Sequence, residues 1–128
     1  MSINFSAKFL PYEKQILTAV ANALPLAENQ QFVDQIECVN KVQRLLEWNE
    51  VEFYCMHWFK VRWPERVLFA RRDEFQIASV ECAFGESVVP VKILVTAGHV
   101  FSLEAKQGLK ALARDGVCTI KAVQLVAL

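Results

Sequence analysis

Residues 75–104 read FQIASVECAFGESVVPVKILVTAGHVFSLE, and this stretch decides the fold class. Three apolar-rich runs within it, 75–84, 88–96 and 99–104, have the length and composition of strands. Short turn segments separate the runs: Gly85, Glu86 and Ser87 in the first gap, Ala97 and Gly98 in the second. Because gaps this short join antiparallel neighbours, the stretch predicts a three-stranded antiparallel sheet.

The second turn carries a histidine that deserves a chemical test. His99 follows Gly98, and Glu104 closes the strand, as the edge of an active site would require. A glycine between two apolar runs is, however, typical of a hairpin that needs positive φ. We therefore predict that His99 is a hydrogen-bonding turn residue and neither a base nor a metal ligand.

The first half of the chain predicts a helical hairpin followed by a long strand. Apolar spacing indicates one helix that begins at Pro11 and ends near Pro25, and a second from about Ala27 to Leu46. In residues 51–63, VEFYCMHWFKVRW, the period changes to two: one face is apolar and includes His57, and the other mixes aromatic and charged residues.

The last part of the chain predicts a short helix at 106–116 and a final strand at 117–126. The pattern is an α+β domain spanning residues 1–128, with an N-terminal helical hairpin packed on a mainly antiparallel sheet of four or five strands. The side chains expected in its core are Ile16, Val20, Phe32, Ile36, Val39, Phe53, Phe59, Val91, Ile93, Phe101 and Leu103.

Composition limits the classes of function. The 14 basic and 14 acidic residues cancel, which argues against a surface built to hold nucleic acid. The mean hydropathy of +0.23 is high for a small domain and favours a surface that meets a partner. No secretion signal or membrane-spanning run is recognised, and four cysteines without a C-x-x-C pair are expected to be reduced thiols, so we expect a cytoplasmic protein that does not enter a membrane.

No motif of a known catalytic site is present. The sequence lacks a G-x-S-x-G elbow, a G-x-G-x-x-G turn and a phosphate-binding loop. Two histidines far apart, without a cysteine or carboxylate at ligand spacing, do not predict a zinc site. Cys55 and His57 share a strand face, but that face is expected to be core, where a thiol is inert. We therefore expect a protein that is not an enzyme and needs no cofactor.

The charge pattern favours a binding surface around the strand at 51–63. The segment EWNEVE holds three acids, and aromatic residues follow on the outer face of the strand before a basic region at 60–72. Tyrosine, tryptophan and arginine are enriched in protein interfaces. The candidate partner-binding residues are Glu47, Glu50, Glu52, Tyr54, Trp58 and Arg62.

The chain resembles the immunity proteins of bacterial polymorphic toxins, especially those of contact-dependent growth inhibition systems. The shared marks are Gln35-Ile36 on the second helix, the aromatic run from Phe53 to Trp63, and a late motif made of Gly98, Val100, Leu103 and Glu104. The resemblance implies a cytoplasmic protein that binds the C-terminal effector domain of its cognate toxin, often a nuclease, and blocks the active site.

Two other interpretations stay open at this level. A cone-shaped α+β domain, as in ketosteroid isomerases, would use Cys55, His57, Phe59 and Trp63 to line a small-molecule pocket, with His57 as acid or base. A homodimer that pairs its sheet faces is the third interpretation. Coverage of Trp58 by the segment after Gly116 would remove Trp58 from any interface.

Overall fold

Two helices form an antiparallel hairpin at the start of the described chain. The computed structural model describes residues 9–113 and 116–126. Helix α1 (Pro11–Ala23) has proline in its first turn, and the backbone N–H of Leu10 donates to Glu13 Oε1 at 2.7 Å. Helix α2 (Leu26–Cys38) follows directly after Pro25. The predicted helical hairpin and its break at Pro25 are therefore confirmed.

Six strands form one antiparallel sheet in the order β1-β2-β7-β6-β5-β8. Strands β5 (Phe75–Phe84), β6 (Ser87–Thr96) and β7 (His99–Glu104) make the meander predicted from residues 75–104. Strands β1 (Lys41–Leu45) and β2 (Glu50–Tyr54) extend it on one side, and β8 (Thr119–Leu125) pairs with β5 at the other edge. The sheet thus has more strands than the four or five predicted, within the expected α+β class.

The second helix is shorter than predicted, and this part of the prediction is wrong. The helix ends at Cys38, and residues 41–45, expected to be helical, form β1. Hydrogen bonds of Asn40 explain the change from helix to strand. Its backbone N–H donates to the Tyr54 carbonyl at 3.0 Å, and its side chain bonds both the N–H and the C=O of Met56. Val42 is buried either way, so apolar spacing did not distinguish a longer helix from a new strand.

The predicted strand at 51–63 is interrupted, and this prediction is corrected as well. Strand β2 ends at Tyr54, and the chain then forms a small separate hairpin from β3 (Met56–His57) and β4 (Lys60–Val61). Trp58 and Phe59 lie at its turn, where Trp58 has a φ of 59°. Phe59, expected in the core, is 94% exposed, and His57 is exposed rather than buried.

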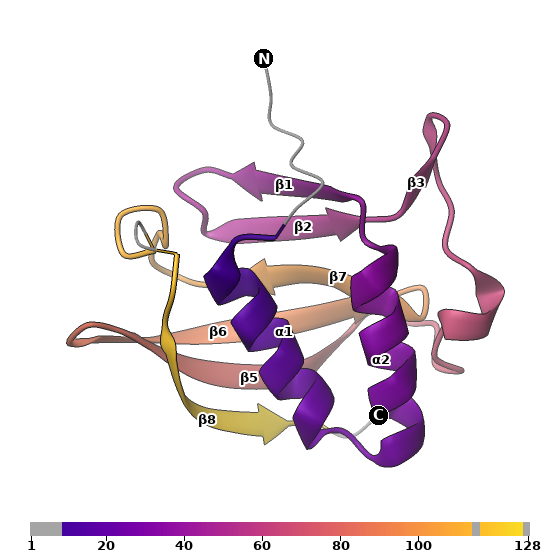
Figure 1. Cartoon of the computed structure of the whole chain (residues 1–128). Coiled ribbons are helices and arrows are strands. Elements are labelled where there is room, and N and C mark those ends of the chain that lie inside the picture. Colours follow the sequence, from indigo (N-terminus) through magenta and orange to yellow (C-terminus); the bar gives the residue numbers. More distant parts are fainter. Residues whose placement is uncertain (1–8, 114–115, 127–128) are drawn as a thin grey trace.

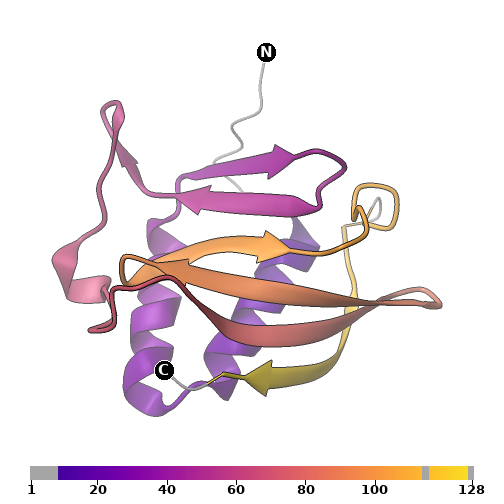
Figure 2. The ribbon, with the colours of Figure 1, turned by 180° about the vertical axis from the view of Figure 1, so that it is seen from behind.

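The two helices cover one face of the sheet, and no described helix covers the other (Figures 1 and 2). Of the expected core residues, nine are buried: Ile16, Val20, Phe32, Ile36, Val39, Phe53, Val91, Ile93 and Leu103. Phe101 is only partly buried, because it lies at a β-bulge where the register between β6 and β7 shifts. The core therefore lies between the helices and the inner sheet face.

An ion pair joins α1 to the corrected strand β1. Arg44 donates through Nε and Nη2 to the two carboxylate oxygens of Glu13, both at 2.7 Å, and the Glu13 side chain is fully buried. The pair ties the first turn of α1 to β1, while the rest of the helix packs toward β5 and β8.

The segment between β7 and β8 does not form the helix predicted for 106–116. Within its described residues it turns once, with the Ala113 N–H donating to the Leu109 carbonyl at 2.7 Å, and residues 114–115 lie outside the described part. The final strand is confirmed at Thr119–Leu125. As the edge neighbour of β5, β8 extends the sheet and does not cover its outer face.

Candidate protein-binding face

The turn at Ala97-Gly98 is a structural hairpin, as predicted. Ala97 and Gly98 have φ values of 52° and 87°. The Gln35 side chain fixes the turn from α2, because its Nε2 donates to the carbonyls of Val67 (2.7 Å) and Gly98 (3.1 Å) while its Oε1 accepts from Val100 N–H at 2.8 Å.

The His99 ring makes a short polar contact and stacks on a neighbouring aromatic ring. Its Nδ1 lies 3.0 Å from the Val100 carbonyl oxygen, and its ring stacks on Trp63 with 4.2 Å between centroids. Burial lowers the pKa of His99 below its ordinary value. A buried, stacked imidazole of this kind has the geometry of a packing residue.

Three predicted site residues share the outer face of β2. Glu50, Glu52 and Tyr54 alternate with the buried Val51 and Phe53, so they point away from the helices. The Tyr54 hydroxyl donates to Glu52 Oε1 at 2.5 Å. The structure thus brings these three side chains together, as the sequence predicted.

A fourth acid, Glu104, joins this face through strand pairing. Glu104 on β7 lies directly opposite Glu50 on one side and Lys92 on the other. The sequence pattern showed Glu104 only as the end of a strand, and its place beside Glu50 depends on the pairing of β2 with β7. We call Glu50, Glu52 and Glu104 the acidic face.

The acidic face gathers three carboxylates, with Lys92 opposite one of them. Burial, followed by the neighbouring carboxylates of Glu52 and Glu104, raises the pKa of Glu50. Four other acids, Glu13, Asp34, Glu65 and Asp73, form ion pairs elsewhere in the described part of the chain. A cation brought to this face would lower the free energy of the ionised carboxylates.

A shallow hollow lies at one end of the same face. Its volume is about 490 Å³, and it is lined by Asn49, Glu50, Ser79, Pro90, Lys92, Glu104, Ala105 and Lys106. The lining residues come from four different strands or their ends, so the hollow depends on the assembled sheet.

Glu47 is separate from the other predicted acids. It lies in the turn between β1 and β2, where its carbonyl accepts from Lys110 N–H at 3.1 Å and its backbone packs closely on Gly108. Its side chain is exposed at the end of β2 away from the β3–β4 hairpin. The structure therefore places Glu47 at the margin of the acidic face.

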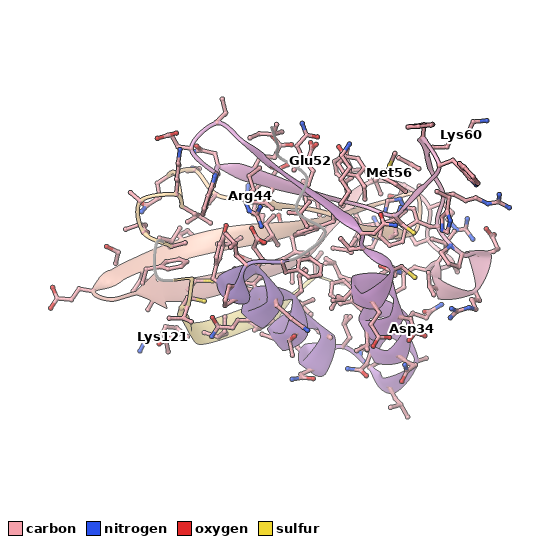
Figure 3. All side chains as sticks on the ribbon, turned by 45° about the horizontal axis from the view of Figure 1, so that its top comes forward. Asp34, Arg44, Glu52, Met56, Lys60 and Lys121 are labelled. Atoms are coloured by element: carbon pink, nitrogen blue, oxygen red, sulfur yellow. The ribbon has the colours of Figure 1, made fainter. Side chains whose placement is uncertain are left out.

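The β3–β4 hairpin carries the two most exposed aromatic residues of the described chain. Trp58 and Phe59 are each 94% exposed, and Val61 is 52% exposed. His57, Lys60 and Arg62 surround them and are exposed too. Figure 3 shows Met56 and Lys60 on this projecting hairpin, at the opposite end of the molecule from Lys121 of β8. The C-terminal strand therefore does not cover Trp58.

The hairpin also bears on the small-molecule interpretation. Phe59 and His57 project into solvent, whereas Cys55 is buried at the root of the hairpin. Since two of the four proposed lining residues are exposed, the four do not enclose a common pocket.

Comparison with known proteins leaves the family open. No family model, no curated protein and no solved structure matches this chain. Within residues 9–113 and 116–126, no helix is long and apolar enough to cross a membrane, and no group of three histidine, cysteine or acidic side chains is placed to hold a metal ion.

Proposed function

We propose that this protein is a cytoplasmic immunity protein that binds the C-terminal effector domain of a cognate toxin and blocks its active site. One observation carries the proposal: strand β2 presents carboxylates on a face that no described helix covers and leads directly into a hairpin with an exposed aromatic tip. The resemblance to immunity proteins of polymorphic toxins agrees with this arrangement.

The acidic face would meet the basic surface of the effector domain. The substrate channel of a nuclease is lined by cations that bind phosphates, and Glu50, Glu52 and Glu104 offer oxygen anions in their place. These carboxylates repel one another in the free protein. Folding has therefore already supplied part of the free energy needed to bring them together. Long-range attraction between the two charged surfaces would also raise the association rate.

The hairpin would supply the apolar anchor. An exposed tryptophan beside an exposed phenylalanine is costly in water, and large aromatic side chains dominate the energetic centres of interfaces. Lys60 and Arg62 flank the pair and would form part of a polar rim. Phe59 is thus added to Tyr54, Trp58 and Arg62 as a residue of the proposed interface.

Binding can be tested with the effector domain of the toxin encoded by the adjacent reading frame. We expect wild-type protein to bind this domain and suppress its toxic activity, and Trp58→Ala to weaken the affinity by about 30-fold, or about 2 kcal/mol, through faster dissociation. Leu26→Ala is the matched control, because Leu26 is 85% exposed at the start of α2, away from the hairpin.

Each outcome of the titration has a definite meaning. Equal affinity of Trp58→Ala and wild type would remove the hairpin from the interface, and no binding by either protein would end the immunity proposal. A stable dimer in sedimentation that Trp58→Ala dissociates would instead favour a second copy of this chain as the partner of the hairpin.

A further inference from the structure

The four cysteines of this chain meet in two pairs. The thiols of Cys38 and Cys55 lie close enough to influence each other's ionisation, and so do the thiols of Cys82 and Cys118. All four are free thiols. The members of each pair are far apart in the sequence, so the fold and not local spacing brings them together.

The contact between Cys38 and Cys55 is held by the backbone on either side. Cys38 is the last residue of α2, and Cys55 is the residue between β2 and β3. Asn40 bonds the backbone of Tyr54 and of Met56, the two neighbours of Cys55, at 2.7–3.0 Å. These bonds fix the end of the helix beside the root of the hairpin.

The pair formed by Cys82 and Cys118 is poorly placed for a disulfide. Cys82 lies opposite Ile120 in the sheet, and Cys118 lies two residues further along, so the cysteines occupy diagonal positions. Diagonal Cα atoms are about 7–8 Å apart, beyond the ~4.4–6.8 Å that a disulfide spans. The side chain of Gln15 also holds both backbone groups of Cys118, at 2.7 and 2.9 Å, and resists the movement that bonding would need.

The other pair has better access to solvent. Cys38 and Cys55 lie where a helix ends and where a strand is interrupted, so they do not occupy diagonal positions of a strand pair. Cys38 is partly exposed, whereas Cys55, Cys82 and Cys118 are buried. A small oxidant in solution therefore reaches Cys38 first.

We propose that Cys38 and Cys55 are a redox-active dithiol that a small-molecule disulfide, such as glutathione disulfide, oxidises to a disulfide bond. The Cys38 thiolate attacks glutathione disulfide, forms a mixed disulfide and releases one glutathione thiolate. Cys55, as its thiolate, then attacks the Cys38 sulfur and displaces the second glutathione. Two cysteine thiols and one glutathione disulfide become one protein disulfide and two glutathione thiols, which take up the two protons.

The surroundings assign the order of these steps and their pH dependence. Cys38 is the more accessible of the two thiols, and the neighbouring Cys55 thiol favours its thiolate, so Cys38 is the attacking sulfur. Burial nevertheless raises the pKa of both thiols above the ordinary value, so only a small fraction is thiolate at neutral pH. Oxidation should therefore become faster as the pH rises from about 7 to about 9, because the thiolate is the nucleophile.

The disulfide would tie the end of α2 to the root of the hairpin that carries Trp58 and Phe59. Strands β1 and β2 would lie inside the closed loop. This disulfide does not depend on the toxin proposal, since it involves neither the acidic face nor the aromatic tip of the hairpin.

Mass spectrometry of the folded, full-length protein tests the proposal. After incubation with glutathione disulfide, acid quenching and alkylation under denaturing conditions, we expect two alkylated cysteines instead of four and a linked peptide pair containing Cys38 and Cys55. Reduction with dithiothreitol before alkylation should restore four alkylated cysteines. Cys55→Ser should stop at the mixed disulfide and carry one glutathione on Cys38, and Cys38→Ser should form no Cys55 linkage.

Cys82→Ser is the matched control and should still form the Cys38–Cys55 bond. Circular dichroism should first show that each variant is folded, because Cys55 and Cys82 are buried. Four alkylated cysteines in treated wild type would overturn the proposal, as would a bond confined to Cys82 and Cys118. If Cys55→Ser is unfolded, the proposal is still tested by the linked peptide in wild type and by its loss in Cys38→Ser.

Discussion

Three amide side chains take the place of backbone partners in this molecule. Asn40, Gln35 and Gln15 each bond both a backbone N–H and a backbone C=O of a segment distant in the sequence. Such a side chain pairs with backbone polar groups that the helix and strand hydrogen bonds leave over. At the scale of single residues, much of the specificity of the fold therefore rests on neutral polar groups.

Gln35 offers the most direct test. It is fully buried and bonds Val67, Gly98 and Val100. Gln35→Leu would remove the side-chain partner of the Val67 carbonyl and of the Val100 N–H, whereas the Gly98 carbonyl keeps its bond from Phe69 N–H, and we expect a loss of roughly 3 kcal/mol in the free energy of unfolding. Urea denaturation measures it, with Gln30→Leu as control, since Gln30 is exposed on the same helix. Equal losses in both variants would refute the assignment.

His99 should make stability depend on pH. Burial lowers its pKa in the folded state below the ordinary value of 6.5. The unfolded chain then binds the proton more readily, so the contribution of His99 is complete above about pH 6.5 and is lost as the pH falls below it.

Replacing His99 by Gln should remove that dependence and leave toxin neutralisation nearly intact. The free energy of unfolding, measured in urea at about pH 7 and about pH 5, should differ less between the two conditions for the variant than for wild type. His57→Gln, at an exposed position, is the comparison. An unchanged difference in His99→Gln, or a selective loss of neutralisation with normal stability, would contradict this view of His99.

At the scale of elements, turns and strand breaks decide what the surface presents. The β6–β7 turn packs on the segment before β5, where Phe69 N–H donates to the Gly98 carbonyl at 2.8 Å and Ala97 N–H donates to the Arg72 carbonyl at 3.1 Å. The β5–β6 turn, in contrast, projects freely: a Cβ added at Gly85 would meet nothing within 4 Å. Both turns hold a glycine at positive φ, but the surroundings of the two glycines differ.

This contrast gives a matched pair of substitutions. Gly98→Val combines the strain of positive φ with contacts of 2.9 Å to the Phe69 carbonyl oxygen and 3.0 Å to Arg72 Cδ. Gly85→Val carries the φ strain alone, which is worth about 1–3 kcal/mol. Thermal and urea denaturation should show the larger loss for Gly98→Val. Similar losses would mean that the close approach of residues 69–72 is unimportant for stability.

At the scale of the whole molecule, neutral net charge conceals a division between surfaces. The acidic face lies on the uncovered side of the sheet, and the exposed cations Lys60 and Arg62 lie on the hairpin that follows it. A partner of the proposed kind would sense the local charge, because screening limits the reach of each charge to about 8 Å at physiological salt.

Charge reversal tests whether the acidic face directs association. Glu50→Lys should slow association with the effector domain by roughly tenfold at low ionic strength, and the effect should fade as salt rises. Glu86→Lys changes the net charge equally at the exposed β5–β6 turn and should have little effect. Stopped-flow kinetics over a range of salt measures both. Equal slowing by the two variants would show that net charge, and not this face, matters.

The sequence by itself determined the elements whose signals are local. Strands β5, β6 and β7 were predictable because an apolar run and its turn residues lie within a few positions of each other, and α1 because Pro11 and Pro25 mark its ends. The shared face of Glu50, Glu52 and Tyr54 followed from the two-residue period of a strand.

Only the tertiary structure decided the rest. Residues 41–45 became a strand because Asn40 pairs with Tyr54 and Met56, and Phe59 became exposed because the chain turns at Trp58 after β2 ends. Glu104 joined the acidic face, and Cys38 met Cys55, through contacts between distant segments. Apolar periodicity reports which side of an element is buried; it carries no information about hydrogen bonds made across the chain, and those bonds set where this helix stops and which side chains meet.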